Sequence, residues 1–398
     1  MNFLYALVYL YLSFLPKDYN TNYTRINSSD KVVIIMIDGM GVDYYRNSEM
    51  PTLRMIEKKG GYKEVSALMP TVTNVNNAAI CTGFFPEKNG ITGNTFYNKE
   101  KEQEFFMEDD SLLLAPTIFE RAKAKGVHSL LFSSKKKTTS LLFKGSDEAI
   151  SPETATQKWI DAVGKPPSVF SREVNYWLFN AALYAMKNMP DVDLYYIHPT
   201  DYPMHTWAPE SKESKEHLHT LDSLIHAIML LLPQAKIFIT ADHSVHQKSL
   251  CLDLQKICLN RNMPIKAAVS AEKDKYFIHH RGFGGTSYIY LQHTKDAASV
   301  KKLLLSVKGV ETVMSREEAA VKYHLLPSRI GDLVVFGDKY TVFGDLEKEE
   351  QETLPNTYRS HGSTYELAVP VFMYNVADAT NKLKKVAYNF QITQFAGF

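Results

Sequence analysis

The sequence predicts an α/β protein in which helices sandwich a mostly parallel sheet, with a smaller α+β lobe inserted towards the end of the chain. Runs of β-branched residues such as KVVIIMI at 31–37 and AKIFIT at 235–240 are typical of parallel strands that are buried on both faces. Amphipathic helical segments separate these runs, as in βαβ units. Residues 245–357 differ, because short strands there alternate with charged helices, which indicates the inserted lobe.

The composition is that of a globular protein without a polyanionic partner. The chain has 398 residues, 45% of them hydrophobic, which suffices for one large core with an inserted lobe or for two domains. Lys plus Arg total 45 and Asp plus Glu total 44, so a nucleic acid polymer is not an expected partner. The cysteines Cys81, Cys251 and Cys258 are too few for a disulfide scaffold. Cys251 and Cys258 are either two buried thiols or, in an exported protein, a pair.

Residues 1–30 form a hydrophobic segment and a linker. Phe3 to Leu15 is uncharged and apolar, with the length of a signal-peptide core, and it is too short for a stable membrane span. Glycosylation sequons begin at Asn22 and Asn27, although such triplets often arise by chance. We expect a secreted or periplasmic protein if this segment is a signal, and a cytoplasmic one otherwise.

The first core strand, Lys31 to Ile37, ends at Asp38. An acidic residue at the carboxyl end of a buried strand lies where open α/β sheets bind their ligands. The simpler alternative is that Asp38 caps the turn that follows. A short helix over Pro51 to Lys59 then returns the chain towards Thr73.

Thr73 lies just before an apolar helical run, Ala78 to Thr82, which Gly83 ends. A hydroxyl at that junction faces unpaired backbone N–H groups and the positive end of the helix dipole, where an anion such as phosphate is also held well. The alternative is that Thr73 is only an N-cap, the usual role of threonine before a helix.

The middle of the chain adds a helix over Ala115 to Lys125 and a strand over Val127 to Phe132. Lys135 and Lys137 follow that strand within a run of three lysines. Such a run usually forms a solvated surface turn. Its position at the same sheet edge as Asp38 favours an alternative, a local clamp for an anion.

Asp201 and His205 follow a helix over Ser171 to Met189 and a strand over Asp193 to Ile197. An aspartate and a histidine four residues apart can converge on one ion, and a carboxylate with an imidazole suits Zn²⁺. An isolated pair of this kind is common and is a weak signal alone.

Asp242 and His243 stand together after a helix over Lys212 to Leu232 and a strand over Ala235 to Thr240. An adjacent Asp–His pair at a strand end is a stronger metal signal than an isolated histidine, although a hydrogen-bonded Asp–His turn is the alternative. This is the third strand end that carries acidic or histidine residues, which makes coincidence improbable.

The inserted lobe spans residues 245–357, and the core comprises 31–244 and 358–398. The strands expected in the lobe are Ala267 to Val269, Tyr276 to His280, Ser287 to Leu291 and Leu333 to Phe336, with helices over Ala297 to Ser306 and Arg316 to Tyr323. The chain contains no dinucleotide fingerprint and no P-loop. It rejoins the core near His361, before a buried strand over Ala368 to Tyr374.

Six ordered motifs carry a family resemblance: IDG at 37–39, MPTVTNVNNAAICTG at 69–83, NGITGNTFY at 89–97, TDYPMH at 200–205, ADH at 241–243 and YRSHGS at 358–363. The chain resembles the alkaline phosphatase superfamily, in its nucleotide pyrophosphatase/phosphodiesterase branch, and within it most of all the phosphonoacetate hydrolases. The resemblance runs from about Lys31 to the C-terminus and implies an alkaline phosphatase-like core.

The resemblance implies two Zn²⁺ ions per chain, each held by three side chains. Asp201, His205 and His361 would hold one ion. Asp38, Asp242 and His243 would hold the other, with the Thr73 hydroxyl on or near it. Asn94 corresponds to the family asparagine that donates a hydrogen bond to a phosphoryl oxygen.

The implied activity is hydrolysis of phosphonoacetate to acetate and phosphate, a step of phosphonate catabolism. Attack by Thr73 would give a phosphothreonine that water then hydrolyses, because metal coordination activates a hydroxyl. The departing carbon leaves as an enolate when a carboxylate is next to it. Lys135 and Lys137 correspond to the family lysines that bind that carboxylate, which favours a phosphonate over a nucleotide.

Two other functions stay open. One is phosphodiester hydrolysis of a nucleotide or a phospholipid on the same site, and the other is an inactive family member that only binds a ligand. The second would require loss of a metal ligand or of Thr73, and none is lost. Ser244 stands where the family pattern has glycine, and Arg281 is a further candidate near the substrate carboxylate. A homodimer is compatible with the sequence.

Overall fold

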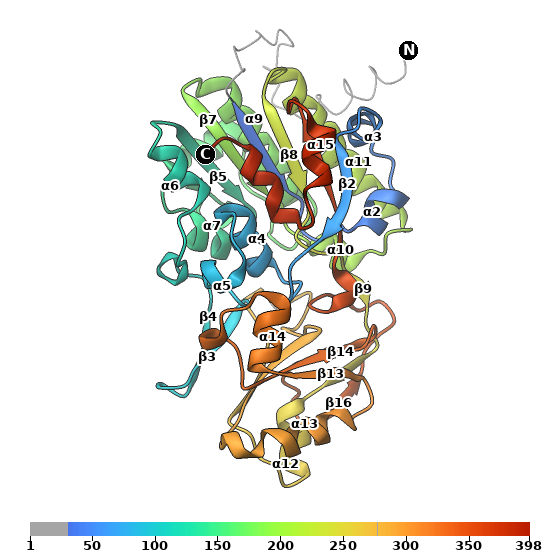
Figure 1. The fold of residues 1–398 in the computed structure, drawn as a ribbon. Helices are drawn as coiled ribbons and strands as arrows, with labels where there is room; N and C mark the ends of the chain where they lie inside the picture. The colour runs from blue at the N-terminus through green and yellow to red at the C-terminus, as the bar shows by residue number, and fades with distance from the viewer. Residues whose placement is uncertain (1–30, 277) are drawn as a thin grey trace.

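The computed structural model describes residues 31–276 and 278–398, which form two lobes (Figure 1). The N-terminal apolar segment and both sequons lie outside the described residues. No helix within the described ranges has both the length and the apolar character that crossing a membrane requires. Cys81, Cys251 and Cys258 are buried free thiols, so the possible Cys251–Cys258 pair is not formed.

A seven-stranded sheet forms the centre of the larger lobe. Its strands in spatial order are β2 (Tyr62–Ser66), β18 (Ala368–Tyr374), β8 (Lys236–Thr240), β1 (Val32–Met36), β7 (Val192–His198), β5 (His128–Ser133) and β6 (Glu148–Ile150). Only β18 runs against the other six. All five residues of β1 are buried, as expected for a central strand covered on both faces. The predicted α/β class with a mostly parallel sheet is confirmed.

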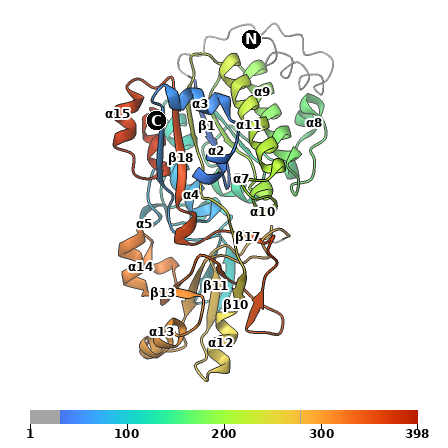
Figure 2. The same ribbon diagram turned by 90° about the vertical axis from the view of Figure 1, so that its right-hand side faces the viewer.

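Helices cover both faces of this sheet (Figures 1 and 2). One face carries α3 (Pro51–Lys58), α9 (Glu173–Asn188) and α11 (Lys212–Leu231), and the other carries α4 (Thr73–Thr82), α6 (Ile118–Lys123), α7 (Lys136–Leu142) and the 3₁₀ segment η6 (Asn389–Phe395). The predicted helix over 115–125 is shorter in the structure. A capping box between Thr117 and Glu120 makes α6 begin at Ile118.

The smaller lobe has two sheets and a hydrophobic cluster of its own. One sheet consists of β11 (Ala267–Ser270), β12 (Thr286–Tyr290), β14 (Leu333–Gly337) and β13 (Val310–Ser315), and the other of β15 (Thr341–Phe343), β10 (Leu250–Leu252) and β16 (Gln351–Thr353). Its helices are α12 (Leu254–Asn260), α13 (Ala297–Leu305) and α14 (Arg316–Tyr323). Buried Ile257, Ile289 and Leu304 belong to the cluster that joins these elements.

Two features of this lobe differ from the sequence prediction. The expected strand over Tyr276 to His280 is wrong, because its described residues form turns around a hydrogen bond of 2.7 Å from the Tyr276 N–H to Asp274 Oδ1. The hairpin of β3 (Thr95–Asn98) and β4 (Gln103–Phe106) belongs by sequence to the core range but packs against the smaller lobe (Figure 1). No local pattern in the sequence indicates that contact.

The chain passes between the lobes through a short antiparallel ribbon, β9 (His246–Gln247) and β17 (Arg359–Ser360). The buried Glu366 carboxylate accepts a hydrogen bond of 2.8 Å from Lys248 Nζ and lies 3.2 Å from His246 Nδ1. His246 Nε2 lies 3.4 Å from Asp43 Oδ2. Burial opposes protonation of His246, but these two carboxylates outweigh it and raise its pKa to about 9.

This network predicts a stability contribution that depends on pH. The folded-state pKa of His246, about 9, lies above its unfolded value of roughly 6.5. The contribution of His246 to the free energy of unfolding is therefore complete below about pH 6.5 and is lost as the pH rises through about 9. We expect the difference in Tm between wild type and His246→Gln to shrink over that range in thermal unfolding experiments. The exposed His293→Gln variant is the control, and a constant difference would contradict the prediction.

Candidate active site

The side chains predicted to bind metal come together at one edge of the large sheet. Asp38, Asp201 and Asp242 follow the carboxyl ends of β1, β7 and β8, which are adjacent parallel strands. His361 precedes β18, which runs in the opposite direction, so its start lies at the same edge. Binding sites of open α/β sheets occur at this edge.

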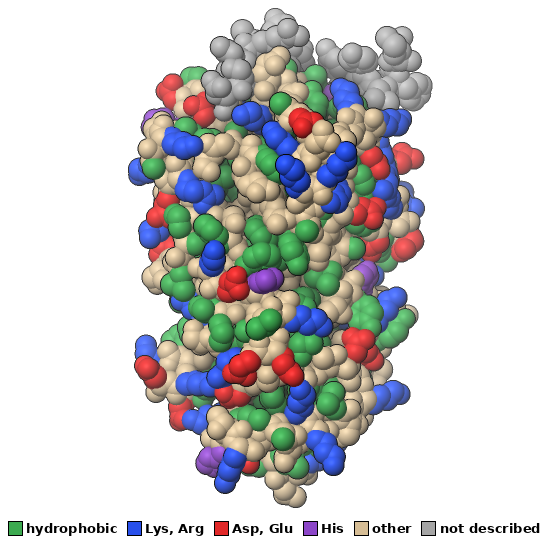
Figure 3. Space-filling model, viewed as in Figure 1, with side chains coloured by type: hydrophobic (Ala, Val, Ile, Leu, Met, Phe, Trp, Pro, Cys, Tyr) green, Lys and Arg blue, Asp and Glu red, His purple; other side chains and the backbone are tan. Residues whose placement is uncertain are grey.

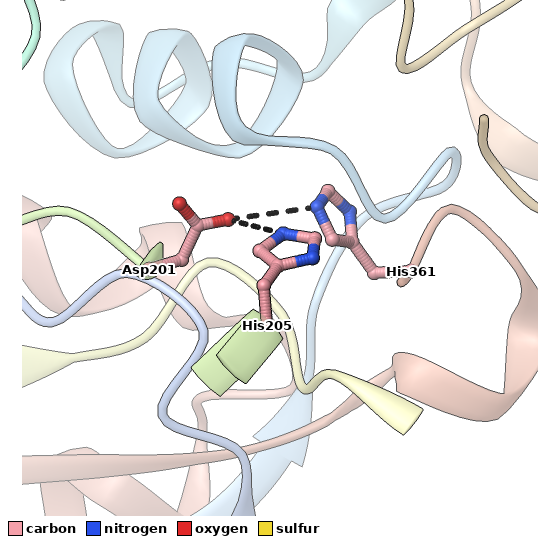
Figure 4. Close-up of side chains that lie close together, drawn as sticks. All are labelled: Asp201, His205 and His361. Carbon is pink, nitrogen blue, oxygen red and sulfur yellow. Dashed lines mark hydrogen bonds and ion pairs between the residues drawn. The ribbon is translucent and has the colours of Figure 1, made fainter. Parts of the chain in front are cut away.

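Asp201, His205 and His361 form the first group of possible ligands, and all three are buried (Figure 4). Helix α10 (Tyr202–Thr206) begins directly after Asp201 and therefore places His205 one turn further on the same face. His205 Nε2 lies 2.9 Å and His361 Nε2 lies 3.6 Å from Asp201 Oδ2. Three ligand atoms thus surround one point.

Asp38, Asp242 and His243 form the second group. His243 Nε2 lies 3.2 Å from Asp242 Oδ2 and 3.5 Å from Asp38 Oδ1. The ring of His243 stacks on that of His361 with centroids 3.6 Å apart, so the two groups are neighbours. Asp38 is not the cap of its turn, because the Gly39 N–H donates to Asp242 Oδ1 instead, at 3.0 Å.

The backbone fixes which nitrogen of each histidine is available. Nδ1 of His205, His361 and His243 lies 2.8, 2.7 and 3.0 Å from a carbonyl oxygen, that of Arg359, Thr71 and Ser244 respectively. A carbonyl oxygen only accepts hydrogen bonds, so each Nδ1 carries a proton, and Nε2 is the nitrogen of each ring that is available to a metal ion. This is the arrangement of histidine ligands in metal centres.

Several buried polar atoms in the two groups have no hydrogen-bond partner. They are Asp38 Oδ1, Asp242 Oδ2, His243 Nε2, His361 Nε2 and Thr73 Oγ1. Buried polar atoms are otherwise nearly always paired, and exceptions mark functional positions or bound ions. Burial and the nearby His361 lower the pKa of His243 to about 3, so a proton does not fill this gap at pH 7. The residues therefore fit two cations, and their nitrogen and oxygen donors suit Zn²⁺.

The charges of the carboxylates also fit the binding of cations. Burial and the neighbouring Asp38 raise the pKa of Asp242 well above its ordinary range. Lys135 Nζ lies 2.7 Å from Asp201 Oδ1 and 3.2 Å from Asp38 Oδ2. Burial acts against ionisation of Asp201, but the Lys135 ammonium outweighs it and holds the pKa of Asp201 well below the ordinary value. This ammonium pairs with two of the three carboxylates and leaves Asp242 without a positive partner, a position that a cation would fill.

Thr73 is the first residue of α4, and it is not the N-cap. The N-cap position belongs to Val72, and no side chain caps this helix. The Thr73 hydroxyl is buried and without a partner, as a nucleophile beside a metal ion would be. Asn94 lies next to it, because Asn94 Oδ1 accepts a hydrogen bond of 3.1 Å from the Asn74 N–H. A phosphoryl group at the helix start would meet both side chains.

Lys135 and Lys137 point into the site and do not form a solvated turn. Each is 3% exposed, whereas Lys136 between them is an exposed residue. Lys137 makes a very short ion pair with Asp274 of the smaller lobe. Both lysines thus have carboxylate partners inside the protein.

The loop between β11 and β12 contributes residues to the site, and of these the sequence prediction missed Glu272 and Asp274. Glu272, Asp274, His279 and His280 reach the site from the smaller lobe, as their contacts with Lys137, Asn94 and the metal-ligand groups show. The signal was present, because two acidic residues and two histidines occur within nine positions. Arg281, the candidate considered from sequence, instead pairs with Glu352 at 2.7 Å on the surface.

The sequence prediction also missed His198. Its Nε2 lies 3.1 Å from Asp38 Oδ2, and the Ser133 hydroxyl lies 2.8 Å from its Nδ1. His198 is the last residue of β7, and its buried ring holds Asp38 in place. Histidine ending a strand is too common a pattern to have singled it out.

Glu272, Asp274 and His280 form a third buried group of possible ligands, but its histidine has the wrong tautomer. The Gly282 N–H donates to His280 Nδ1 at 2.9 Å, so the ring proton is on Nε2. That N–H points at Asp274 Oδ1, 3.2 Å away. His280 is therefore a hydrogen-bond donor here and not a metal ligand.

Comparisons with known proteins agree with this site. A family model described as "Type I phosphodiesterase / nucleotide pyrophosphatase" matches residues 32–364. The crystal structure of phosphonoacetate hydrolase from Sinorhizobium meliloti 1021 in complex with phosphonoacetate is similar, with TM-score 0.82 and 26% identity over 94% of this chain and 95% of that one.

Other similar proteins are an ectonucleotide pyrophosphatase/phosphodiesterase and a bis(5'-adenosyl)-triphosphatase. Murine ectonucleotide pyrophosphatase/phosphodiesterase 5 has a similar fold, with TM-score 0.65 and 17% identity over 86% and 88% of the two chains. Bis(5'-adenosyl)-triphosphatase ENPP4 of Mus musculus is 27% identical over 59% of this chain and 53% of its own length. The chain thus spans about half the length of the curated relatives that it matches.

The two ligand groups predict how many metal ions the protein binds. Because each group supplies three ligands, we expect about two Zn²⁺ per chain by elemental analysis, and a lower Tm and no activity after chelation. His243→Gln should lose about one of the two ions, while the exposed His128→Gln should keep both. An active protein without transition metal would contradict this prediction.

Proposed function

The chain belongs to the type I phosphodiesterase / nucleotide pyrophosphatase family and is a hydrolase, and from that premise we propose that it cleaves the carbon–phosphorus bond of phosphonoacetate. The observation that carries the proposal is the pair of buried lysines beside the two ligand groups. The similarity of nearly the whole chain to a phosphonoacetate hydrolase supports it. Acetate and phosphate would be the products.

The two Zn²⁺ ions, when bound, would activate the nucleophile and neutralise charge on the phosphoryl group. Thr73 attacks phosphorus through Oγ1 and forms a phosphothreonine, and water hydrolyses that ester in a second step. Asn94 donates a hydrogen bond from Nδ2 to a phosphoryl oxygen. Its orientation is set before the substrate binds, since its Oδ1 is held by the Asn74 N–H.

The lysines act on the leaving group. Carbon departs poorly from phosphorus unless the electron pair is delocalised, and a neighbouring carboxylate allows departure as an enolate. A cation next to that carboxylate stabilises the enolate charge as it develops. Lys135 lies against ligands from both metal groups, and this supports a role for its ammonium beside the reacting phosphorus.

Phosphodiester hydrolysis is the second candidate function. The family and the sequence relatives of the ENPP4 type favour it. Rings of Phe170, Tyr202 and His279 lie within about 6 Å of one another beside the first metal group, and they could contact an organic group of a diester. A panel of phosphonoacetate, p-nitrophenyl phosphate, bis(p-nitrophenyl) phosphate and ATP on the metal-loaded protein separates the two functions.

The nucleophile predicts a variant that is folded but inactive. Thr73→Ala should abolish turnover on every substrate while metal content and Tm stay close to wild type, since the hydroxyl has no partner and even a true cap contributes only about 1 kcal/mol. Thr82→Ala at the other end of α4 is the matched control and should remain active. Near-wild-type activity of Thr73→Ala would exclude it as the nucleophile.

The lysines predict a selective effect on one substrate. Lys135→Ala/Lys137→Ala should lose several kcal/mol of transition-state stabilisation on phosphonoacetate, since hydrogen bonds to charged groups contribute roughly 1.5–3 kcal/mol each. On a p-nitrophenyl ester, whose leaving group needs no such help, the loss should be small. Comparison of kcat/KM on both substrates tests this, with the exposed Lys136→Ala as control. Equal losses, or none, would refute the phosphonate assignment.

A further inference from the structure

His198 is a buried histidine that belongs to neither group of possible metal ligands. Charged side chains of both signs lie scattered over both lobes on the face that Figure 3 shows, whereas His198 is fully buried at the end of β7. Its Nε2 lies 3.1 Å from Asp38 Oδ2 and 3.3 Å from Asn77 Nδ2, and its Nδ1 lies 2.8 Å from the Ser133 hydroxyl. Because both ring nitrogens have neighbours of this kind, the orientation of the ring is fixed.

The partners of the ring decide which nitrogen carries the proton. A carboxylate oxygen only accepts hydrogen bonds, so the Nε2–H of His198 donates to Asp38 Oδ2 and its Nδ1 accepts from the Ser133 hydroxyl. Ser133 Oγ in turn accepts a hydrogen bond of 3.2 Å from the Lys135 N–H. Lys135 Nζ donates to Asp38 Oδ2 at 3.2 Å. A closed ring of hydrogen bonds therefore passes through Lys135, Ser133, His198 and Asp38.

This ring occupies one oxygen of Asp38 and leaves the other free. Oδ2 accepts from His198 and Lys135, whereas Oδ1 has no hydrogen-bond partner and lies 3.5 Å from His243 Nε2. Asp242 is divided in the same way, because its Oδ1 accepts from two backbone N–H groups at 3.0 and 2.9 Å and its Oδ2 has no partner. The second ligand group therefore presents one oxygen of each aspartate together with a histidine nitrogen.

The two partners of Asp38 Oδ2 differ in their other contacts. Lys135 also donates to Asp201 Oδ1 at 2.7 Å, so it contacts both ligand groups, and the proposed function directs its ammonium to the substrate. Among the six possible metal ligands, His198 forms a hydrogen bond with Asp38 alone within the described part of the chain. His198 can therefore hold Oδ2 with or without a bound substrate, and it acts on one of the two groups.

We propose that His198 is a positioning residue for the second metal ion, because it holds Asp38 Oδ2 and so turns Oδ1 towards the ion. Groups that hold a metal ligand from behind fix its orientation, and their loss typically weakens metal binding roughly ten- to hundredfold. The inference rests on that part of the proposed function which places an ion in the second group. It does not depend on the identity of the substrate.

The test measures the Zn²⁺ affinity of each variant by competition with a chromophoric chelator. The amide of glutamine can take the place of Nε2 and donate to Asp38, whereas the shorter asparagine reaches only the place of Nδ1, beside Ser133. We expect His198→Asn to bind one of the two ions roughly ten- to hundredfold more weakly and the other as in wild type. His198→Gln should recover part of that loss. The control is His217→Gln, at a buried histidine of α11 outside both ligand groups.

Activity at different zinc concentrations gives a second readout, on whichever substrate of the panel the wild type hydrolyses fastest. At limiting zinc His198→Asn should be slow, and excess Zn²⁺ should restore most of its rate, because the nucleophile and the six possible ligands are all retained. A structural defect would instead lower the rate at every zinc concentration. Failure of excess Zn²⁺ to restore the rate of a folded His198→Asn variant would contradict the proposal.

The affinities decide the remaining alternatives. Equal weakening of both ions, unchanged affinities in His198→Asn, or a His198→Gln variant as weak as His198→Asn would overturn the proposal. If His198→Asn does not fold, Ser133→Ala decides, since it removes the partner of Nδ1 and should weaken the same single ion by a smaller factor. Unchanged affinities in Ser133→Ala would then overturn it. A wild-type protein that binds no metal would refute the proposed function, whereas two ions without hydrolysis of phosphonoacetate would refute only its substrate.

Discussion

Three carboxylates buried together at one sheet edge set the constraint on which the rest of this site depends. Asp38, Asp201 and Asp242 are each at most 1% exposed, and like charges so close in a low-dielectric interior repel strongly. His243 and His361 do not offset that charge, because burial lowers the pKa of both rings and keeps them neutral. Lys135 brings one positive charge. Divalent cations would neutralise what is left, so the same ions would both stabilise the fold and supply the charge that phosphoryl chemistry needs.

The sheet meets this constraint through the order of its strands. Because β7, β1 and β8 are adjacent and parallel, the residues that follow these strands come together at one edge of the sheet. The one antiparallel strand, β18, begins at the same edge and brings His361 with it. Backbone carbonyl groups orient the histidines of the site, and His198 holds Asp38. The arrangement of the possible metal ligands therefore follows from regular secondary structure.

The sequence predicted the core strands and the residues at their ends, but it did not predict the start of α4 or the loop of the smaller lobe. The strands of the core were readable because they are buried on both faces, and the residues at their ends follow directly. The cap alternative for Thr73 failed because helix propensity does not tell whether the hydroxyl residue is the N-cap or the first helical residue, and the difference is one position. The segment Tyr276 to His280 was misread as a strand because its apolar residues resemble one. Local hydrogen bonds to Asp274 and His280 set the turns around it, and the ion pair of Asp274 with Lys137 crosses between the lobes.

The two lobes contribute different parts of the candidate site. The core supplies the two groups of possible metal ligands, Thr73 and the two lysines, whereas the smaller lobe supplies the loop with Glu272, Asp274 and His279. In this chain Asp274 cancels the charge of Lys137. Burial and Asp274 raise the pKa of Glu272 well above its ordinary range, which favours its uncharged form. Burial also lowers the pKa of His279, so that ring is neutral. Lys135 pairs with Asp38 and Asp201, so its ammonium would be left to a substrate anion only when cations neutralise those two carboxylates.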